Sequence, residues 1–304
     1  MRRILLAATI TSVYLHSAPV LAQESDFESL VAEASIEPTI SVSLNPDMRA
    51  LVESANAFSL DLMREVRARD ENLIISPASV STAVGFAYRG AVGDTASQLK
   101  SVMRYPFDPE QYLKASGALI TTMSFSAQGR EFRSANAIWL QEGMPLNQGY
   151  EQDMNAYAKA SLGHADFKAG AEVARQLVNR WAMAATSGNV EELLKAGIVT
   201  TGTRAVLVNA VWFKAEWLHP FSKEVTRSGP FTAIDGSITS TAQMHRRGQF
   251  VAFQRDGVGV IQLPYKGGEV ALVVFLPDKA GALPKFGSRP SRWCNFGCGR
   301  GPSS

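Results

Sequence analysis

Cysteine is almost absent from this chain. Only two of its 304 residues are cysteine, and both, Cys294 and Cys298, lie within the last eleven. The fold therefore cannot depend on disulfides, which excludes the disulfide-framework class of small exported domains. A zinc site at this pair is also excluded, because four ligands are needed and neither a second cysteine pair nor a histidine lies nearby.

Motifs for catalysis and cofactor binding are missing too. The sequence contains no G-x-S-x-G, no H-E-x-x-H and no G-x-x-x-x-G-K-[ST]. Gly257 and Gly259 lack the third glycine and the following helix of a dinucleotide site, so we interpret them as part of a turn. We therefore expect no catalytic residue, no cofactor and no metal, and we predict that the protein is not an enzyme.

No hydrophobic run of membrane-spanning length is present, and the least interrupted run lies at the N-terminus. The basic pair Arg2-Arg3 precedes an almost unbroken apolar run over residues 4–15, and small residues follow between Ala18 and Ala22. This order is typical of an export signal, so we predict a signal peptide over residues 1–22, cleaved after Ala22. The alternative, an N-terminal membrane anchor, needs about 20 apolar residues, more than this run supplies.

Export determines where we expect the mature chain. We predict a secreted, extracellular protein, or a periplasmic one if the source is a Gram-negative bacterium, with no membrane attachment after cleavage. Residues 23–44 are polar and mixed, and we expect them to form a flexible lead-in.

Charge of one sign is concentrated only at the two ends. The formal net charge is +2, from 30 basic and 28 acidic residues. Residues 1–22 and 287–304 contain arginines and no acid, so the part between them is slightly acidic. The basic balance therefore does not indicate a nucleic-acid partner. A heparin-like polyanion is not expected either, because the helix predicted over 109–125 carries only Lys114.

Helix signals dominate the first half of the chain. Asn45-Pro46, Ser76-Pro77 and Asp108-Pro109 each place a capping side chain before a proline, an arrangement that begins helices. A short helix is predicted after Asp94, and further helices over 147–159 and 171–186.

Strand signals dominate the second half. Residues 203–213 form a long apolar run that suits a strand buried on both faces. Another strand is predicted over 132–140, and residues 231–276 alternate strand-like runs with Asp-Gly and Gly-Gly turns. A short apolar strand is also predicted over 72–75. Helices followed by strands predict an α+β fold.

A series of segments follows the order and spacing of one known family. They are Asn72–Val80, Gly90–Thr95, Asn136–Leu140, Val178–Trp181 with Thr186–Val190, Leu207–Lys214 with Trp217 and Pro220-Phe221, Leu263–Gly268, and Phe275–Pro277. Together they resemble the serpins, from near Asn56 to about Phe286. The resemblance implies the serpin fold, with helices packed on a large mixed β-sheet A and with sheets B and C. We interpret residues 45–286 as a partial serpin domain, incomplete at its C-terminus.

The resemblance also implies an activity. In this family a target protease attacks an exposed reactive-centre loop, and the cleaved loop inserts into sheet A as an extra strand that carries the acylated protease with it. The implied partner is a serine protease, or a cysteine protease, and a folded inhibitor is expected to be a monomer.

Four residues match sites that control this insertion. By resemblance, Ser76, Ser79 and Asn209 belong to the shutter region, where sheet A parts, and Trp217 to the breach, where the loop first enters. Small hydroxyls and an amide can exchange hydrogen bonds when a strand enters. The residues alone favour ordinary structural roles for Ser76, as a helix N-cap, and for Asn209, as a partner of buried backbone, and the resemblance reverses that preference. For Trp217 the alternative is a core or rim aromatic.

The resemblance stops after Phe286. Residues 287–304 concentrate Gly, Ser, Arg and Pro and contain no aliphatic residue, so we predict a disordered tail. Its composition resembles a frame-shifted reading of a GC-rich gene, with a genuine short tail as the alternative. By resemblance, the reactive-centre bond and the histidine of the shutter network are missing. That histidine matches none of the four present, which are His16, His164, His219 and His245.

Two functions follow from these observations. The first is an exported serpin, ancestrally a serine-type endopeptidase inhibitor, that is inactive as written and prone to aggregate because strands lack partners. The second is a non-inhibitory, serpin-like binding protein.

Overall fold

The structure is a computed structural model that describes residues 3–10, 44–66, 73–127, 130–233, 236–255, 257–268 and 270–277. The described chain forms two compact units, one of residues 3–10 and 44–214 and the other of residues 215–277. We describe each unit by itself. The predicted tail over 287–304 lies outside the described residues, as does nearly all of the lead-in over 23–44.

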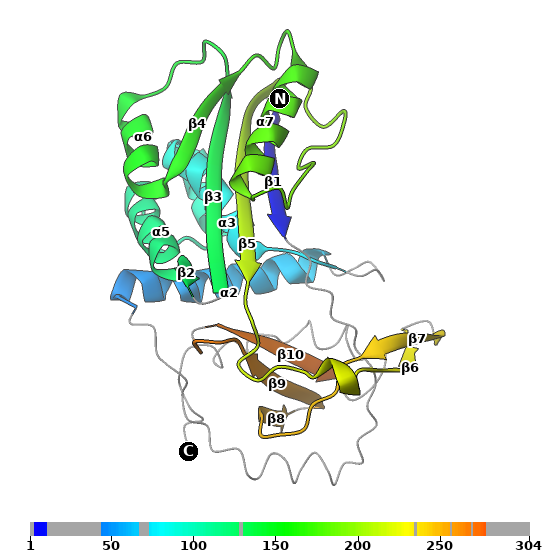
Figure 1. The fold of residues 1–304 in the computed structure, drawn as a ribbon. Helices are drawn as coiled ribbons and strands as arrows, with labels where there is room; N and C mark the ends of the chain where they lie inside the picture. Colours follow the sequence, from blue (N-terminus) through cyan, green and yellow to red (C-terminus); the bar gives the residue numbers. More distant parts are fainter. Residues whose placement is uncertain are drawn as a thin grey trace. The chain divides into compact units, whose positions relative to one another are not determined.

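The first unit is built on a five-stranded mixed sheet, which we call sheet A (Figure 1). Its strand order is β1-β5-β3-β2, and β4 also pairs with β3. The strands are β1 (Arg3–Ile10), β2 (Phe125–Ala127), β3 (Arg130–Gln141), β4 (Ala160–Ala165) and β5 (Thr203–Lys214). The β3–β5 pair is antiparallel and long, and β5 is flanked by β1 on its other edge. The long apolar run over 203–213 therefore forms an interior strand that is paired on both sides.

Strand β1 falls on the residues predicted to form the export signal. It pairs parallel with β5, from Ile4 opposite Ala205 to Ile10 opposite Val211. A parallel strand inside a sheet is typically a nearly continuous apolar run, and residues 4–10 fit that pattern. The same composition thus suits both an export signal and a sheet strand.

Four helices precede the long strands, and their starts confirm the capping signals. They are α2 (Pro46–Val66), α3 (Pro77–Arg89), α4 (Gly93–Val102) and α5 (Pro109–Met123). The Asn45 side chain accepts a hydrogen bond from the Met48 amide at 2.8 Å, and Asp108 accepts one from the Gln111 amide at 2.9 Å. Each cap satisfies a backbone donor that has no partner within the helix.

Two more helical segments surround β4. The helix α6 (Gln148–Asp153) continues into a π-helical turn, η1 (Met154–Ala158), and α7 (Ala171–Ala185) follows β4. Helix α5 approaches η1 so closely that a Cβ on Gly117 would lie 2.0 Å from the Tyr157 carbonyl oxygen. Only glycine fits at this crossing.

Each face of sheet A is buried against different elements. Because side chains alternate along a strand, Ile138 and Leu140 of β3 face one way and Ala137 and Trp139 the other. The first pair packs with Phe86 of α3 and other residues of that side. The second pair packs in a cluster that includes Ala174 and Val178 of α7. The sheet is therefore the middle layer of this unit.

The second unit consists of antiparallel strands. A 3-10 turn, η2 (Lys223–Val225), precedes the pair β6 (Arg227–Thr232) and β7 (Ile238–Gln243). A three-stranded sheet of order β10-β9-β8 follows, made of β8 (Val251–Arg255), β9 (Val258–Pro264) and β10 (Ala271–Pro277). These strands confirm the strand-rich reading of residues 231–276.

The strand predicted over 72–75 is wrong for the residues described. Residues 73–76 have no strand structure, and the side chains of Leu73 and Ile74 are 42% and 60% exposed. An apolar run becomes a strand only when another strand offers its backbone groups, and no described strand pairs with this segment.

Candidate functional site

Asn209 lies at the centre of sheet A with a buried polar contact. Its side chain is 1% exposed and stands directly opposite Asn136 in the β3–β5 register. The Asn209 amide nitrogen donates to Asn136 Oδ1 at 2.7 Å and to Ser134 Oγ at 3.0 Å. Asn136 Nδ2 in turn donates to the Ala158 carbonyl at 3.2 Å. Two neighbouring strands and η1 are thus linked by one chain of side-chain hydrogen bonds.

One acceptor of this group is left unused. The Asn209 Oδ1 atom is buried and has no hydrogen-bond partner among the residues that the structure describes. A buried polar atom without a partner loses about 1–3 kcal/mol relative to a paired one. Asn209 can therefore gain stability from a donor that arrives at this point of the sheet.

Ser76 and Ser79 form a second polar pair, at the start of α3. The Ser76 hydroxyl donates to Ser79 Oγ at 2.8 Å and accepts a hydrogen bond from the Ser79 amide at 3.3 Å. Ser79 is 1% exposed, so its hydroxyl faces the protein interior. The N-cap interpretation of Ser76 is thereby confirmed.

The three shutter residues expected from the sequence form two groups. No hydrogen bond in the described part of the chain joins Ser76 or Ser79 to Asn209. The expectation that Asn209 pairs with buried backbone is wrong, because its amide donates to two side chains. Sequence reasoning missed Ser134 and Asn136, although an asparagine inside the apolar run of β3 was a signal for a buried polar contact.

Helix α7 covers the opposite face of sheet A (Figure 1). Its Ala174 and Val178 share one buried cluster with Val206 and Val208 of β5. Leu194 and Val199, from the segment that connects α7 to β5, belong to the same cluster. The helix and this segment together form a cover over β5.

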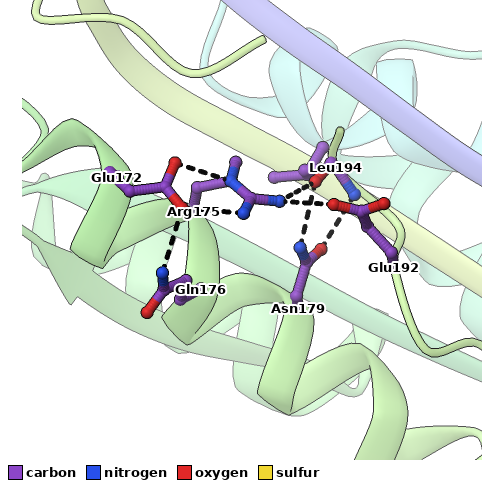
Figure 2. Close-up of polar contacts among 6 residues, drawn as sticks. All are labelled: Glu172, Arg175, Gln176, Asn179, Glu192 and Leu194. Carbon is purple, nitrogen blue, oxygen red and sulfur yellow. Dashed lines mark hydrogen bonds and ion pairs between the residues drawn. The ribbon is translucent and has the colours of Figure 1, made fainter. Parts of the chain in front are cut away.

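A cluster of ion pairs fastens this cover, as Figure 2 shows. Arg175 of α7 donates through Nε and Nη2 to the two oxygens of Glu172, at 2.8 and 2.7 Å. Its Nη1 donates to Glu192 Oε1 at 2.8 Å and to the Leu194 carbonyl at 2.5 Å. One arginine, whose side chain is only 11% exposed, therefore joins the helix to the connecting segment.

Asn179, one turn along α7, adds a reciprocal pair to the same segment (Figure 2). Its Nδ2 donates to the Leu194 carbonyl at 3.0 Å, and its Oδ1 accepts from the Leu194 amide at 2.8 Å. The side chain thus satisfies both backbone groups of a buried leucine, much as a neighbouring strand would. The connecting segment is held without regular secondary structure.

Electrostatics support this cluster. The hydrogen bonds from Arg175, with a further one from Gln176, lower the pKa of Glu172 from 4.5 to about 2. Glu172 therefore stays ionised well below neutral pH, and its ion pair with Arg175 persists over the same pH range.

Trp217 lies in the second unit. Its ring stacks on Tyr265, with centroids 4.4 Å apart and planes 11° from parallel, and it meets the edge of Phe221 at 6.0 Å. Trp217 also forms a backbone bridge with Tyr265. The aromatic interpretation is confirmed within this unit, and the breach role remains a prediction.

Within the described ranges, no three His, Cys, Asp or Glu side chains gather closely enough to hold a metal ion. No helix among those residues has the length and apolar character needed to cross a membrane.

Comparison with known proteins identifies the family. The sequence profile of the serpins, described as serine protease inhibitors, matches residues 53–289. The chain belongs to the serpin family. Because serpins inhibit proteases and are not enzymes, the prediction that the chain is not an enzyme is confirmed.

Relatives span several kinds of organism. The chain is 30% identical over 233 residues to an uncharacterized serpin-like protein of Thermococcus kodakarensis, a match covering 76% of this chain and 54% of that protein. It is also 30% identical over 226 residues to antithrombin-III of Mus musculus, covering 71% of this chain and 48% of that protein. The chain thus spans about half the length of these curated relatives.

Solved structures confirm the predicted fold. Ovalbumin from emu matches with a TM-score of 0.72 at 25% identity, over 80% of this chain and 66% of that one. Arabidopsis AtSerpin1 in its native stressed conformation matches with a TM-score of 0.74 at 24% identity, over 81% and 65%. The α+β serpin fold, with sheets A, B and C, is therefore the fold of this chain.

Proposed function

We propose that this serpin is the strand-accepting part of an exported inhibitor of serine proteases, with sheet A as the accepting element. The observation that carries the proposal is the Asn209 group. The buried Asn209 amide donates to two acceptors on β3, while its own oxygen has no partner among the described residues. We expect these hydrogen bonds to rearrange when a strand enters the sheet.

Insertion is expected beside strand β5. Its buried residues Val206, Leu207 and Val208 offer apolar surface on both faces, and its backbone pairs with β3 on one side and with β1 on the other. A strand that parts β5 from one of these neighbours would pair with β5 along its length, which makes insertion favourable.

The cover over β5 acts as the second element. For a strand to enter beneath α7, the connecting segment around Leu194 must move, and Arg175 and Asn179 hold it in place. These contacts determine how readily helix α7 and the connecting segment move away from β5. They therefore determine the rate at which a strand inserts.

Export is part of the proposal. Its support is the order of a basic pair, an apolar run and small residues over 1–22. The proposed location is extracellular, or periplasmic in a Gram-negative bacterium. The proposed partner is a serine protease, or a cysteine protease, that attacks a loop outside the described residues.

The printed chain by itself is expected not to trap a protease. Trapping needs an acylated loop that then inserts, and the sequence over 287–304 resembles no such loop. A longer form that carries the family's reactive loop is expected to trap.

The test incubates both forms with trypsin-, chymotrypsin- and elastase-like proteases. We expect a covalent complex that survives SDS electrophoresis from the longer form only. A complex from the printed chain would contradict the requirement for the loop. No complex from either form would contradict the inhibitory role and favour a non-inhibitory binding protein.

A further inference from the structure

The side of β5 that lies away from β3 is paired with the N-terminal segment. Strand β1 runs beside β5 in continuous parallel register from Ile4 opposite Ala205 to Ile10 opposite Val211, after one irregularity at Arg3. Helix α3 contacts β1 as well as β5. The N-terminal residues therefore occupy the side of β5 that lies away from β3.

The composition of both strands suits this pairing. Residues 4–10 read Ile-Leu-Leu-Ala-Ala-Thr-Ile, with no charge, proline or glycine. Such runs form the interior strands of parallel sheets. Without a partner, the outer backbone groups of β5 would form an open, apolar edge, which is a template for pairing with other chains.

We infer that the N-terminal segment Arg3–Ile10 is an intramolecular plug for the strand-binding edge of β5, and that its removal opens this edge to extended apolar peptides. The segment then has two roles, which cannot occur in the same chain. During export it is read as a signal and removed, and in a chain that keeps it, it occupies sheet A. This inference does not depend on protease inhibition, because it concerns only the partner of β5.

The inference can be tested first by cross-linking in the printed chain, produced in the cytoplasm of the host so that the N-terminus is kept. Thr9→Cys with Ala210→Cys places two cysteines at paired positions. Paired residues of neighbouring strands lie about 5 Å apart, within the reach of a disulfide. Cys294 and Cys298 are replaced by serine so that they cannot compete.

The matched control moves one cysteine out of register. Thr9→Cys with Val206→Cys separates the pair by four residues along β5, about 13 Å. We expect the in-register pair to form its disulfide rapidly under mild oxidation, and the control pair to form it slowly. Equal yields from both pairs would overturn the inference.

A binding experiment tests whether the edge opens. The probe is a labelled synthetic peptide with the sequence of residues 3–10. Leu6→Pro removes a backbone donor in the middle of β1, and Leu6→Val is the control that preserves the strand. We expect the apparent Kd of the peptide to fall about tenfold in Leu6→Pro, because apparent affinity rises with the fraction of chains whose site is open.

The outcomes are separable. Leu6→Val should bind the peptide as weakly as the unchanged chain. Equal binding by all three proteins would contradict the plug. Should Leu6→Pro fail to fold, the cross-linking yields still decide, because the cysteine pairs leave the backbone of β1 intact.

Discussion

Replacing Asn209 by alanine tests the polar group at the centre of sheet A. The substitution removes the donor to Asn136 Oδ1 and to Ser134 Oγ. Asn136 is 2% exposed, so water cannot take the place of the lost donor, and an unpaired buried acceptor reduces stability by about 1–3 kcal/mol. Part of this loss is offset, because the unpaired Asn209 Oδ1 is removed as well.

The net effect should be a loss of about 1–2 kcal/mol in the free energy of unfolding. For a unit of this size such a loss lowers the melting temperature by about 2–8 °C. Urea denaturation and calorimetry measure both quantities. Asn155→Ala is the matched control, because Asn155 is exposed and its loss should change stability by no more than about 0.5 kcal/mol.

A double-mutant cycle isolates the contact itself. Combining Asn209→Ala with Asn136→Ala should give an interaction energy of about 1 kcal/mol, since the two side chains are in direct contact. If Asn209→Ala were as mild as Asn155→Ala, or if the cycle showed no coupling, the argument from the buried amide pair would be refuted.

Three further predictions concern the cover over β5 and the packing behind sheet A. Arg175→Ala should speed hydrogen exchange of the segment around Leu194 while global unfolding changes little, and unchanged exchange there would refute the fastening role. The pKa of Glu172 is lowered in the folded state, so its stabilising contribution is complete above 4.5 and is lost as the pH falls toward about 2. The protection factor of the same segment, which is taken relative to the intrinsic exchange rate at each pH, should therefore fall on acidification, and fall less in Glu172→Gln. Gly117→Ala should destabilise the first unit by about 2 kcal/mol or more, because its Cβ would meet a backbone oxygen of η1, and a neutral result in urea denaturation would contradict that close approach.

Local signals in the sequence predicted the fold well. The caps at Asn45, Ser76 and Asp108 depend on residues three positions apart, so sequence alone located the helix starts. The apolar runs of β3 and β5 were equally clear. The strand expected over 72–75 failed because its formation depends on a partner strand, which local sequence does not reveal.

The site was less predictable, because it depends on contacts between distant residues. Asn209 and Asn136 are 73 residues apart, and only the register of β3 against β5 places them opposite each other. The resemblance to serpins singled out Asn209 but not its partners. Arg175 carries no local signal of its role, because its partners Glu192 and Leu194 lie 17 and 19 residues further along the chain.

Hydrogen exchange of a cleaved reactive loop tests the central proposal, strand acceptance by sheet A, most directly. A longer form carrying the loop is cut by a protease that it does not trap, and exchange is followed in the loop and in residues 203–214. The account predicts that the cleaved loop becomes protected, that β5 stays protected, and that residues 4–10, where retained, lose protection. A cleaved loop that continues to exchange as freely as an unfolded peptide would contradict it.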